Sequence, residues 1–256
     1  MNMQIRKISA FSQRLLDFLD IVEYRRADAE EDREAIYRLR YDAYKRDNNI
    51  STGFTATSGD FYDESANCHV FGLYVGGSLV SSIRVNICSA ENRISPTNSI
   101  FPDILEPMIQ KGLVFVDPSR FVVDREATKH DPEIVYATLR LVTMAAVYFK
   151  VDYCLATVRP EHNAFYKKYF LLQPISEPRL YPSLAKPVNM LAARLAGVRD
   201  WVVANYPVFD SHYIEQRMLF HAGHWPTLPA RNTSFPEALL KDPHIGSNSP
   251  NFAGIQ

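Results

Sequence analysis

Three side chains that carry an acid, a hydroxyl and a guanidinium group interrupt an otherwise apolar stretch near the middle of the chain. The stretch is Leu113–Val123, and the three residues are Asp117, Ser119 and Arg120. Its valines and phenylalanines predict a strand, and Pro118, which has no N–H for a neighbouring strand, predicts a bulge or an unpaired edge. A carboxylate there can accept a proton, and a bulge exposes backbone N–H groups to an oxyanion. The stretch is a candidate active site; the alternative is an edge strand with a surface acid and arginine.

Two further arginines fall where the sequence pattern predicts burial. Arg40 lies on the apolar face of a helix expected over residues 30–46, and Arg84 lies within a predicted strand. A buried, unpaired charge is very costly, so each arginine needs an acid or a ligand. Asp60 and Asp63 follow a polar loop and are the expected partners; no histidine accompanies them at metal-ligand spacing, and we expect no metal site. The alternative for Arg40 is a purely structural tie between helix and sheet.

The elements that must position these residues follow from hydrophobic periodicity and turn signals. Gly76-Gly77 predicts a tight hairpin. We expect strands over 21–25, 68–75, 78–87, 113–123, 151–158, 171–181 and 187–195, and helices over 5–21, 30–46, 104–109, 133–149 and 161–170 with at least one more within 197–222. The chain then divides into an N-terminal amphipathic helix (1–20), a main domain (21–195), and a C-terminal helical extension with an extended tail (196–256).

Composition excludes several classes of protein. With 28 basic and 29 acidic residues the net charge is -1, which argues against nucleic acid as a partner. The 3 cysteines are odd in number and have no metal-ligand spacing, which favours buried thiols in a reducing, cytoplasmic setting. No uninterrupted apolar run predicts a signal peptide or a transmembrane segment.

The order of elements resembles the GNAT acyltransferase fold, an α/β (α+β) architecture whose mixed, mostly antiparallel sheet splays open at a bulged strand between flanking helices. Four blocks carry a closer resemblance, over about residues 24 to 175, to acyl-homoserine-lactone (autoinducer) synthases and the related N-acyl amino acid synthases. The segment from about 196 has no counterpart. The blocks are Tyr37–Tyr41 with Tyr44, Asp60–Asp63, Ser82–Arg84 and Asp117–Phe121.

The resemblance implies roles for particular residues. Asp117 stands where the family has a glutamate assigned to the acceptor amine; it is one methylene shorter, so a bridging water is needed for it to act as base. Ser58 stands where relatives often carry a further acid. With Asp117, Arg120 is the expected catalytic residue. The expected substrate-binding residues are Arg40, Tyr44, Asp60, Asp63, Arg84, Ser119 and Phe121.

The acyl donor is expected to be acyl carrier protein, with acyl-CoA as the alternative, and no cofactor is expected to stay bound. Ordinary GNAT enzymes hold the coenzyme A pyrophosphate in a glycine loop at a helix N-terminus, but the segment 125–131 has no glycine, as in the autoinducer-type relatives that use the carrier protein. The alternative for the basic residues of this region is a solvated surface. The expected carrier contacts are Arg125, Lys129, Arg140 and Arg159, with Lys167 and Lys168.

The resemblance, together with these residues, implies acyl transfer from a thioester to a primary amine. An ammonium group cannot attack, so Asp117, helped by Asp60 or Asp63, is the expected base, and backbone amides after Pro118 are the expected oxyanion donors. Tyr166 is either a general acid to the thiolate or a packing residue.

The preferred function is a long-chain N-acyl amino acid synthase. An acyl-homoserine-lactone synthase and a general GNAT N-acetyltransferase that uses acyl-CoA remain alternatives, as does a non-catalytic module that binds an acyl carrier or a lipid.

Overall fold

A seven-stranded sheet forms the centre of the computed structural model, which describes residues 8–46, 59–180 and 186–221. The strands are β1 (Val22–Arg26), β2 (Cys68–Val75), β3 (Ser78–Cys88), β4 (Phe115–Val123), β5 (Tyr153–Val158), β6 (Gln173–Pro174) and β7 (Asn189–Arg194), in the order β1-β2-β3-β4-β5-β7-β6. Among the strand pairs within the described residues, only β4–β5 is parallel. The sheet is therefore mixed and mostly antiparallel, which confirms the expected fold class.

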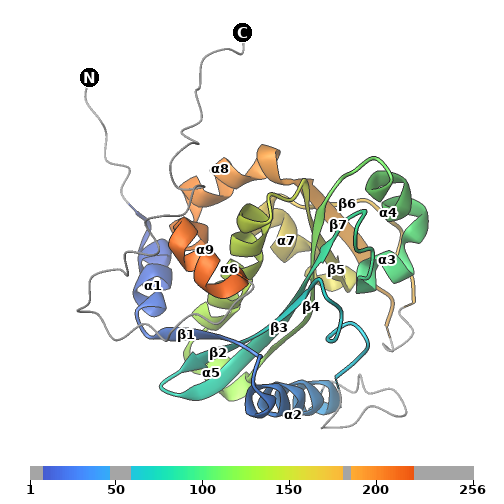
Figure 1. The fold of residues 1–256 in the computed structure, drawn as a ribbon. Helices are drawn as coiled ribbons and strands as arrows, with labels where there is room; N and C mark the ends of the chain where they lie inside the picture. Colours follow the sequence, from blue (N-terminus) through green and yellow to red (C-terminus); the bar gives the residue numbers. More distant parts are fainter. Residues whose placement is uncertain (1–7, 47–58, 181–185, 222–256) are drawn as a thin grey trace, which may run out of the picture. The chain divides into compact units, whose positions relative to one another are not determined.

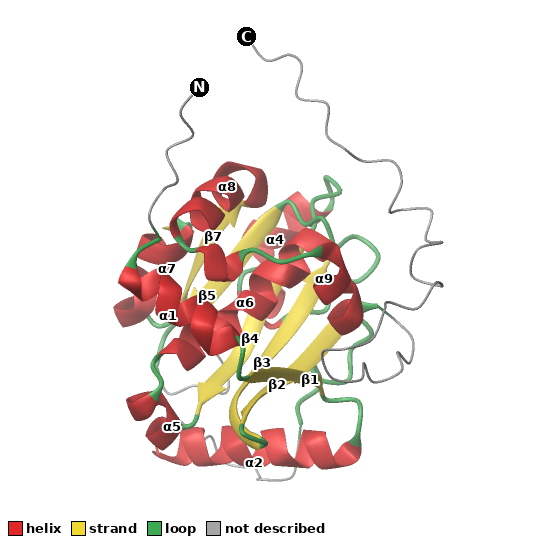
Figure 2. Ribbon diagram, turned by 90° about the vertical axis from the view of Figure 1, so that its left-hand side faces the viewer, coloured by secondary structure: helices red, strands yellow, loops and turns green. Residues whose placement is uncertain are grey.

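Helices cover both faces of this sheet. They are α1 (Ala10–Leu19), α2 (Glu30–Arg46), α3 (Pro96–Ile100), α4 (Pro102–Ile109), α5 (Arg125–His130), α6 (Glu133–Tyr148), α7 (Asn163–Phe170), α8 (Leu195–Asn205) and α9 (Tyr213–Phe220), with short 3₁₀ turns η1 (Pro160–His162) and η2 (Pro207–Phe209). Figure 1 shows α2 on one side of the sheet and α1, α6 and α9 on the other, and in Figure 2 the latter three lie in front of the strands. The mostly apolar α6 is the buried helix that its sequence predicts.

The parallel pair at the centre of the sheet is very short. β4 and β5 are paired only at Phe115–Tyr153 and Val116–Cys154, whereas β5 continues along its whole length beside β7. Beyond these two pairs β4 and β5 diverge. This is the splayed sheet expected from the resemblance to the GNAT fold.

A bulge on β4 accompanies this divergence. Ser82 of β3 pairs with Val122 and Arg84 pairs with Ser119, so that two residues of β4 stand opposite one residue of β3. One of the two is Arg120, whose φ of 51° is unusual for a residue with a side chain. The expected bulge is therefore present in this strand, but at positions 120 and 121; Pro118 itself takes part in the β3–β4 pairing.

Two short helices replace predicted irregular chain, and one predicted strand is nearly absent. Both helices begin at a polar cap: the Ser95 hydroxyl accepts from Asn98 N at 3.1 Å before α3, and the Asp124 carboxylate accepts from Ala127 N at 2.8 Å before α5. Caps of this kind start a helix without any apolar periodicity. The strand expected over 171–181 shrinks to β6 with one isolated bridge at Arg179. The start of the first predicted helix, the loop before residue 59 and the tail lie outside the described residues.

The N-terminal helix α1 docks on the sheet-covering helix α6. Leu15 and Phe18 are 1% and 7% exposed. The ring of Phe11 packs edge-on against that of Tyr136, with the ring centroids 5.2 Å apart. The apolar stripe of α1 is thus used in packing within the core. In the part of the chain that the structure describes, no helix has the length and apolar character needed to cross a membrane.

One buried arginine of α6 fastens the C-terminal segment to the core. Arg140 is 5% exposed and donates to Val208 O at 2.8 Å, to Asp210 O at 2.9 Å and to the Glu215 carboxylate at 3.0 Å. A side chain enclosed in this way cannot meet a carrier protein. The expectation that Arg140 contacts the acyl carrier is therefore wrong, and its role is structural.

Replacing Arg140 with methionine should destabilise the protein. The change leaves the buried carbonyl of Val208 and the carbonyl of Asp210 without their donor, which we expect to lower the free energy of unfolding by about 2–4 kcal/mol. Urea unfolding followed by circular dichroism measures it. The matched control is Lys129→Met, because Lys129 forms an exposed pair with Glu126, and its loss should leave the free energy of unfolding nearly unchanged. Equal stabilities of the two variants contradict the anchoring role.

Candidate functional site

The two arginines predicted to point inward both find carboxylates. Arg40 of α2 is 2% exposed, and its Nη1 donates to both oxygens of Asp63 at 3.0 and 2.9 Å. Asp63 is itself buried and lies 3.4 Å from Nη1 of Arg84. The expected pairing of these arginines with the Asp60–Asp63 segment is therefore confirmed. It joins α2, the segment before β2, and β3 through a buried charge network.

Asp60 is the centre of this network. One of its oxygens accepts from Nη1 of Arg84, and the other accepts from Nε and Nη2 of Arg120 at 3.0 and 2.7 Å. Nε of Arg84 also donates to the Ser119 hydroxyl at 2.8 Å. Burial by itself raises the pKa of Asp60, but the guanidinium groups of Arg84 and Arg120 outweigh it and hold that pKa below the ordinary value of an aspartate. Asp60 is thus ionised at neutral pH and is a poor proton acceptor.

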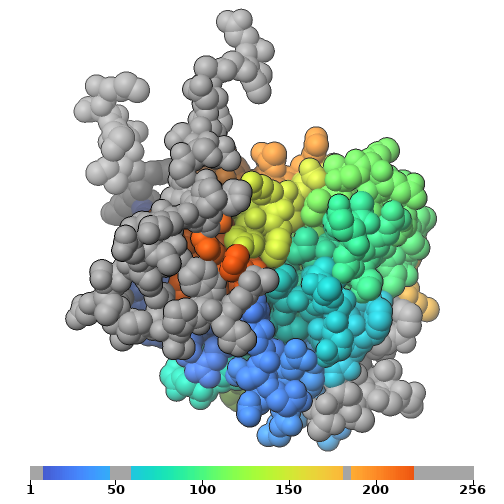
Figure 3. Space-filling model, viewed as in Figure 1, coloured from blue at the N-terminus to red at the C-terminus, as the bar shows by residue number. Residues whose placement is uncertain are grey.

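We define the cluster as Arg40, Asp60, Asp63, Arg84 and Arg120. Tyrosine rings lie against its three arginines. The ring centroids of Tyr37, Tyr62 and Tyr44 lie 5.7, 5.2 and 5.3 Å from the guanidinium carbons of Arg40, Arg84 and Arg120, respectively. Cations are stabilised over such rings. Figure 3 shows the surface that α2 and the residues after it (blue to cyan) share with α3 and α4 (green).

The cluster holds three guanidinium groups and two carboxylates. Among the described residues, Nε and Nη2 of the buried Arg40 have no hydrogen-bond partner. Excess positive charge in a partly buried site favours an anionic ligand. A carboxylate suits this site because it can accept two parallel hydrogen bonds from a guanidinium group. The site can therefore hold a small molecule that carries a carboxylate.

A cavity of about 500 Å³ opens beside the cluster, where β4 and β5 diverge. Its walls come from both strands and from α2, α6 and α7. Polar groups, among them Arg120 and Thr157, line one part, and apolar side chains such as Val135, Leu139 and Phe165 line another. A smaller cavity of about 90 Å³ with Arg84 and Thr97 in its wall adjoins it. Of the residues singled out in the sequence, those that line the large cavity are Tyr44, Pro118, Ser119, Arg120, Phe121, Arg159 and Tyr166.

Asp117, the expected base, does not line this cavity. It is 0% exposed, and both of its oxygens are occupied by Thr97, whose N donates at 2.9 Å and whose hydroxyl donates at 2.6 Å. Burial raises the pKa of Asp117 although these hydrogen bonds oppose the shift. Asp117 therefore cannot touch a ligand in the cavity directly.

A pair of hydroxyls joins Asp117 to the cavity. The hydroxyl oxygens of Thr97 and Thr157 are 2.6 Å apart, and Thr157 of β5 lines the cavity. When Asp117 is ionised, its carboxylate only accepts, so Thr97 donates to it and Thr157 donates to Thr97. Sequence reasoning missed both threonines. Ser95-Pro96 before Thr97 is a helix-start signal that could have placed Thr97 at the head of α3.

The expected carrier residues are spread over the surface, with Arg140 excepted. Lys129 on α5 pairs with Glu126 at 2.8 Å, and Arg159 pairs with Glu161 at 3.2 Å beside the cavity. Arg125 lies on α5, and Lys167 and Lys168 are exposed on α7. His162 stands at the N-cap position of α7, but its side chain makes no capping bond.

Two further groups that could take part in chemistry are held in their neutral forms. Burial raises the pKa of the Cys154 thiol to about 12, so it is a weak nucleophile at neutral pH. Burial likewise raises the pKa of Tyr166 to about 12. Its phenol keeps its proton and can donate it within the cavity.

Comparisons with known proteins agree with this geometry. The family model of FeeM, an N-acyl amino acid synthase, matches residues 35–194. The solved structure of FeeM from uncultured soil microbes superposes with a TM-score of 0.60 at 20% identity, covering 72% of this chain and 96% of FeeM. The structure of BjaI, a CoA-dependent acyl-homoserine lactone synthase, with SAM and isopentyl-CoA gives a TM-score of 0.52 at 15% identity, covering 74% of this chain and 89% of BjaI.

A search among curated protein sequences finds no match. The structural similarities, at these identities, establish the fold. The family model goes further, because it spans well over half of the chain and includes the cluster, the bulged strand and the splayed pair of strands. This chain therefore belongs to the FeeM family of N-acyl amino acid synthases and is an acyltransferase with the GNAT fold.

Proposed function

We propose that the protein transfers a fatty acyl group from an acyl thioester to the amine of an amino acid. The observation that carries the proposal is the arginine-rich cluster beside a half-apolar cavity, at the point where β4 and β5 diverge. Such a cavity offers a charged end for a zwitterionic acceptor and an apolar end for an acyl chain. The description of the family as N-acyl amino acid synthases supports the same reaction.

The acceptor is an amino acid that keeps its carboxylate. Arg120 reaches the cavity with a side chain that is 10% exposed, so its charge is only weakly screened by solvent. The carboxylate of the acceptor binds on this side of the cluster, and its ammonium group lies toward Asp60 and the Thr157 hydroxyl. Arg40, Asp63 and Arg84 hold Asp60 and Arg120 in place, together with Tyr44, Ser119 and Phe121.

The proton of the acceptor leaves through the hydroxyl pair. The ammonium gives a proton to Thr157, Thr157 passes its own to Thr97, and Thr97 passes its own to Asp117, so each hydroxyl ends neutral. The free amine then attacks the thioester carbonyl, and the C–N bond forms. When the tetrahedral intermediate collapses, the C–S bond breaks, and the second amine proton goes to the thiolate. Asp117 later releases its proton to solvent.

Two groups near the reacting carbonyl can assist this step. The backbone N–H groups of Arg120 and Phe121 belong to the bulge, and we assign them to the oxyanion of the intermediate. The phenol of Tyr166, which lines the same cavity and keeps its proton at neutral pH, relays the second amine proton: it gives its own proton to the departing thiolate and takes up that of the amine, so it ends neutral. These assignments rest on position in the cavity wall.

The donor is acyl carrier protein in this proposal. No glycine occurs in 125–131, where ordinary GNAT enzymes bind the coenzyme A pyrophosphate, and the segment forms the capped helix α5. Arg125, Lys129 and Arg159, with the two lysines of α7, present positive charge for an acidic carrier. Acyl-CoA is the competing donor, and purified protein assayed with each thioester distinguishes them.

Expression in a bacterial host should yield acylated amino acids, which mass spectrometry of lipid extracts detects. Arg84→Gln breaks two contacts of the cluster, and we expect its yield to fall about 100-fold or more, since a misplaced substrate costs about that factor. Asp103→Asn, which alters only an exposed ion pair with Arg179, is the matched control and should keep its yield. Homoserine lactones as the main product, or carrier binding without any product, would contradict the proposal.

The acceptor carboxylate should contribute strongly to recognition. We expect kcat/KM for an amino acid such as tyrosine to exceed that for tyramine, which lacks the carboxylate, by about 10- to 100-fold, the worth of a charge-assisted hydrogen bond. In Arg120→Gln the preference should largely disappear. Steady-state kinetics with the two acceptors tests this. Equal kcat/KM values in the wild type rule out the carboxylate contact.

Breaking the hydroxyl pair should slow the reaction without removing the substrate site. Thr157→Val should lower kcat by about 10²–10³, within the range of general-base catalysis, and Thr157→Ser should restore most of it. Thr128→Val, on α5 and away from the cavity, is the control and should keep the wild-type kcat.

The pH profile tests the same relay. Asp117 acts only when ionised, so activity should fall as pH decreases through its pKa, which burial raises above the ordinary value of an aspartate. That acid limb should be absent from the residual activity of Asp117→Asn. A normal kcat in Thr157→Val would show that the proton takes another route.

A further inference from the structure

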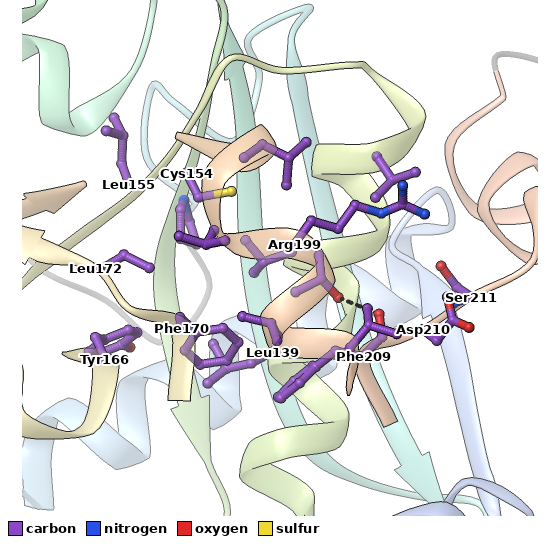
Figure 4. Close-up of a pocket in the computed structure, with 18 of the residues that line it drawn as sticks. Leu139, Cys154, Leu155, Tyr166, Phe170, Leu172, Arg199, Phe209, Asp210 and Ser211 are labelled. Carbon is purple, nitrogen blue, oxygen red and sulfur yellow. Dashed lines mark hydrogen bonds between the residues drawn. The ribbon is translucent and has the colours of Figure 1, made fainter. Parts of the chain in front are cut away.

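A second cavity lies behind the first, on the side of the C-terminal segment. It has a volume of about 60 Å³ and is enclosed between β5, α6, α7, α8 and η2. Figure 4 shows Leu139, Phe170 and Phe209 side by side in its wall, with Cys154 and Leu155 of β5 nearby. Most of the wall is apolar, although Thr143, Arg199, Asp210, Ser211 and Gln216 also line the cavity. The apolar part suits a hydrocarbon group and not a polar one.

This apolar cavity adjoins the large one. Pro118, Leu139 and Tyr166 line both of them. Cys154 also belongs to the last residue pair before β4 and β5 diverge. A chain that enters the large cavity with its thioester near the cluster can therefore run between the two strands and place its end in the apolar cavity. The volume leaves room for about four water-sized groups, which is enough for the last few carbons of a chain.

The far wall of the apolar cavity comes from outside the region that the FeeM family model matches. That match ends at residue 194, and α8 begins at Leu195. Val198 and Val202 of α8 and Phe209 of η2 line the cavity. Val202 and Phe209 are 5% and 3% exposed, so they belong to the core.

This far wall is held firmly in place. Arg140 binds the carbonyls of Val208 and Asp210 on either side of Phe209, and the ring centroids of Phe209 and Phe170 are 4.8 Å apart. Fixed contacts on both sides leave Phe209 little freedom to move aside. A wall that limits the length of a bound chain needs this rigidity.

We propose that α8 and η2 close the acyl-chain site and that Val202 and Phe209 determine the length of the acyl chain that the protein accepts. The inference rests on the proposed function, because the acyl chain is the ligand. It adds that the length limit is set by a C-terminal segment of this chain, beyond the region matched by the family model. Larger side chains at these two positions shorten the site, and smaller ones lengthen it.

Product analysis tests the inference. Val202→Phe fills part of the cavity and should shift the most abundant acylated product toward shorter chains by about two to four carbons, the number that the cavity holds. Phe209→Leu should shift it toward longer chains. Trp201→Phe is the matched control, because Trp201 lies beside Val202 but is 40% exposed and does not line the cavity. Unchanged product lengths in both cavity variants would overturn the inference.

A binding measurement separates this inference from the proposed reaction. Thermal shift with saturated fatty acids of 8 to 18 carbons as probes reports the preferred chain length without any catalysis, and Val202→Leu replaces the phenylalanine variant if that variant does not fold. A shorter preferred fatty acid in the position-202 variant than in the wild type supports the inference. If that shift occurs but the wild type makes no acylated amino acid, only the proposed function fails. The same preferred fatty acid in the wild type and the variant overturns the inference.

Discussion

The divergence of β4 from β5 after two residue pairs is the constraint on which the rest of the structure depends. Two adjacent strands normally form backbone hydrogen bonds with each other along their whole length. Where they separate, the backbone N–H and C=O groups need other hydrogen-bond partners, and the apolar side chains need other packing partners. Here the bulge turns β4 away and puts Arg120 at a φ of 51°, a conformation that costs roughly 1–3 kcal/mol and persists only where surrounding contacts enforce it. The hydrogen bonds from Arg120 to Asp60 supply such contacts. The opening between the strands and the charged cluster are thus one feature.

The cluster in turn fixes the elements around the opening. Asp60 is bound by guanidinium groups from β3 and β4, and Asp63 by those from α2 and β3. None of these buried charges tolerates the loss of its partner, so the segment that carries the two acids is held against both strands. The same requirement separates the roles of the acids. Asp60 and Asp63 are paired with arginines, whereas Asp117 is hydrogen-bonded to the uncharged Thr97, and it is therefore the carboxylate to which we assign the proton transfer.

Much of this arrangement could be predicted from the sequence. Arg40 and Arg84 sit at apolar positions of a helix and a strand, and the cost of an unpaired buried charge is enough to require acids such as Asp60 and Asp63. The local signals stop there. Whether Asp117 faces the cavity or the head of α3 depends on how α3 packs, and a five-residue helix has no periodicity to reveal it. Arg140 looked like a surface contact because its partners are mostly backbone carbonyls about 70 residues away, which no sequence pattern encodes.

The helix α6 links the chemistry to the C-terminal segment. Its Leu139 lines both the large cavity beside the cluster and the apolar cavity behind it, and the next residue, Arg140, binds η2. Neighbouring residues on a helix point about 100° apart, so one residue can face the ligand cavities while the next holds the wall that closes them. A change in the C-terminal segment can therefore alter the apolar cavity without moving Asp60 or Thr157. In the function that we propose, the region shared with the family supplies the reaction, and the segment after residue 194 adjusts which acyl chains reach it.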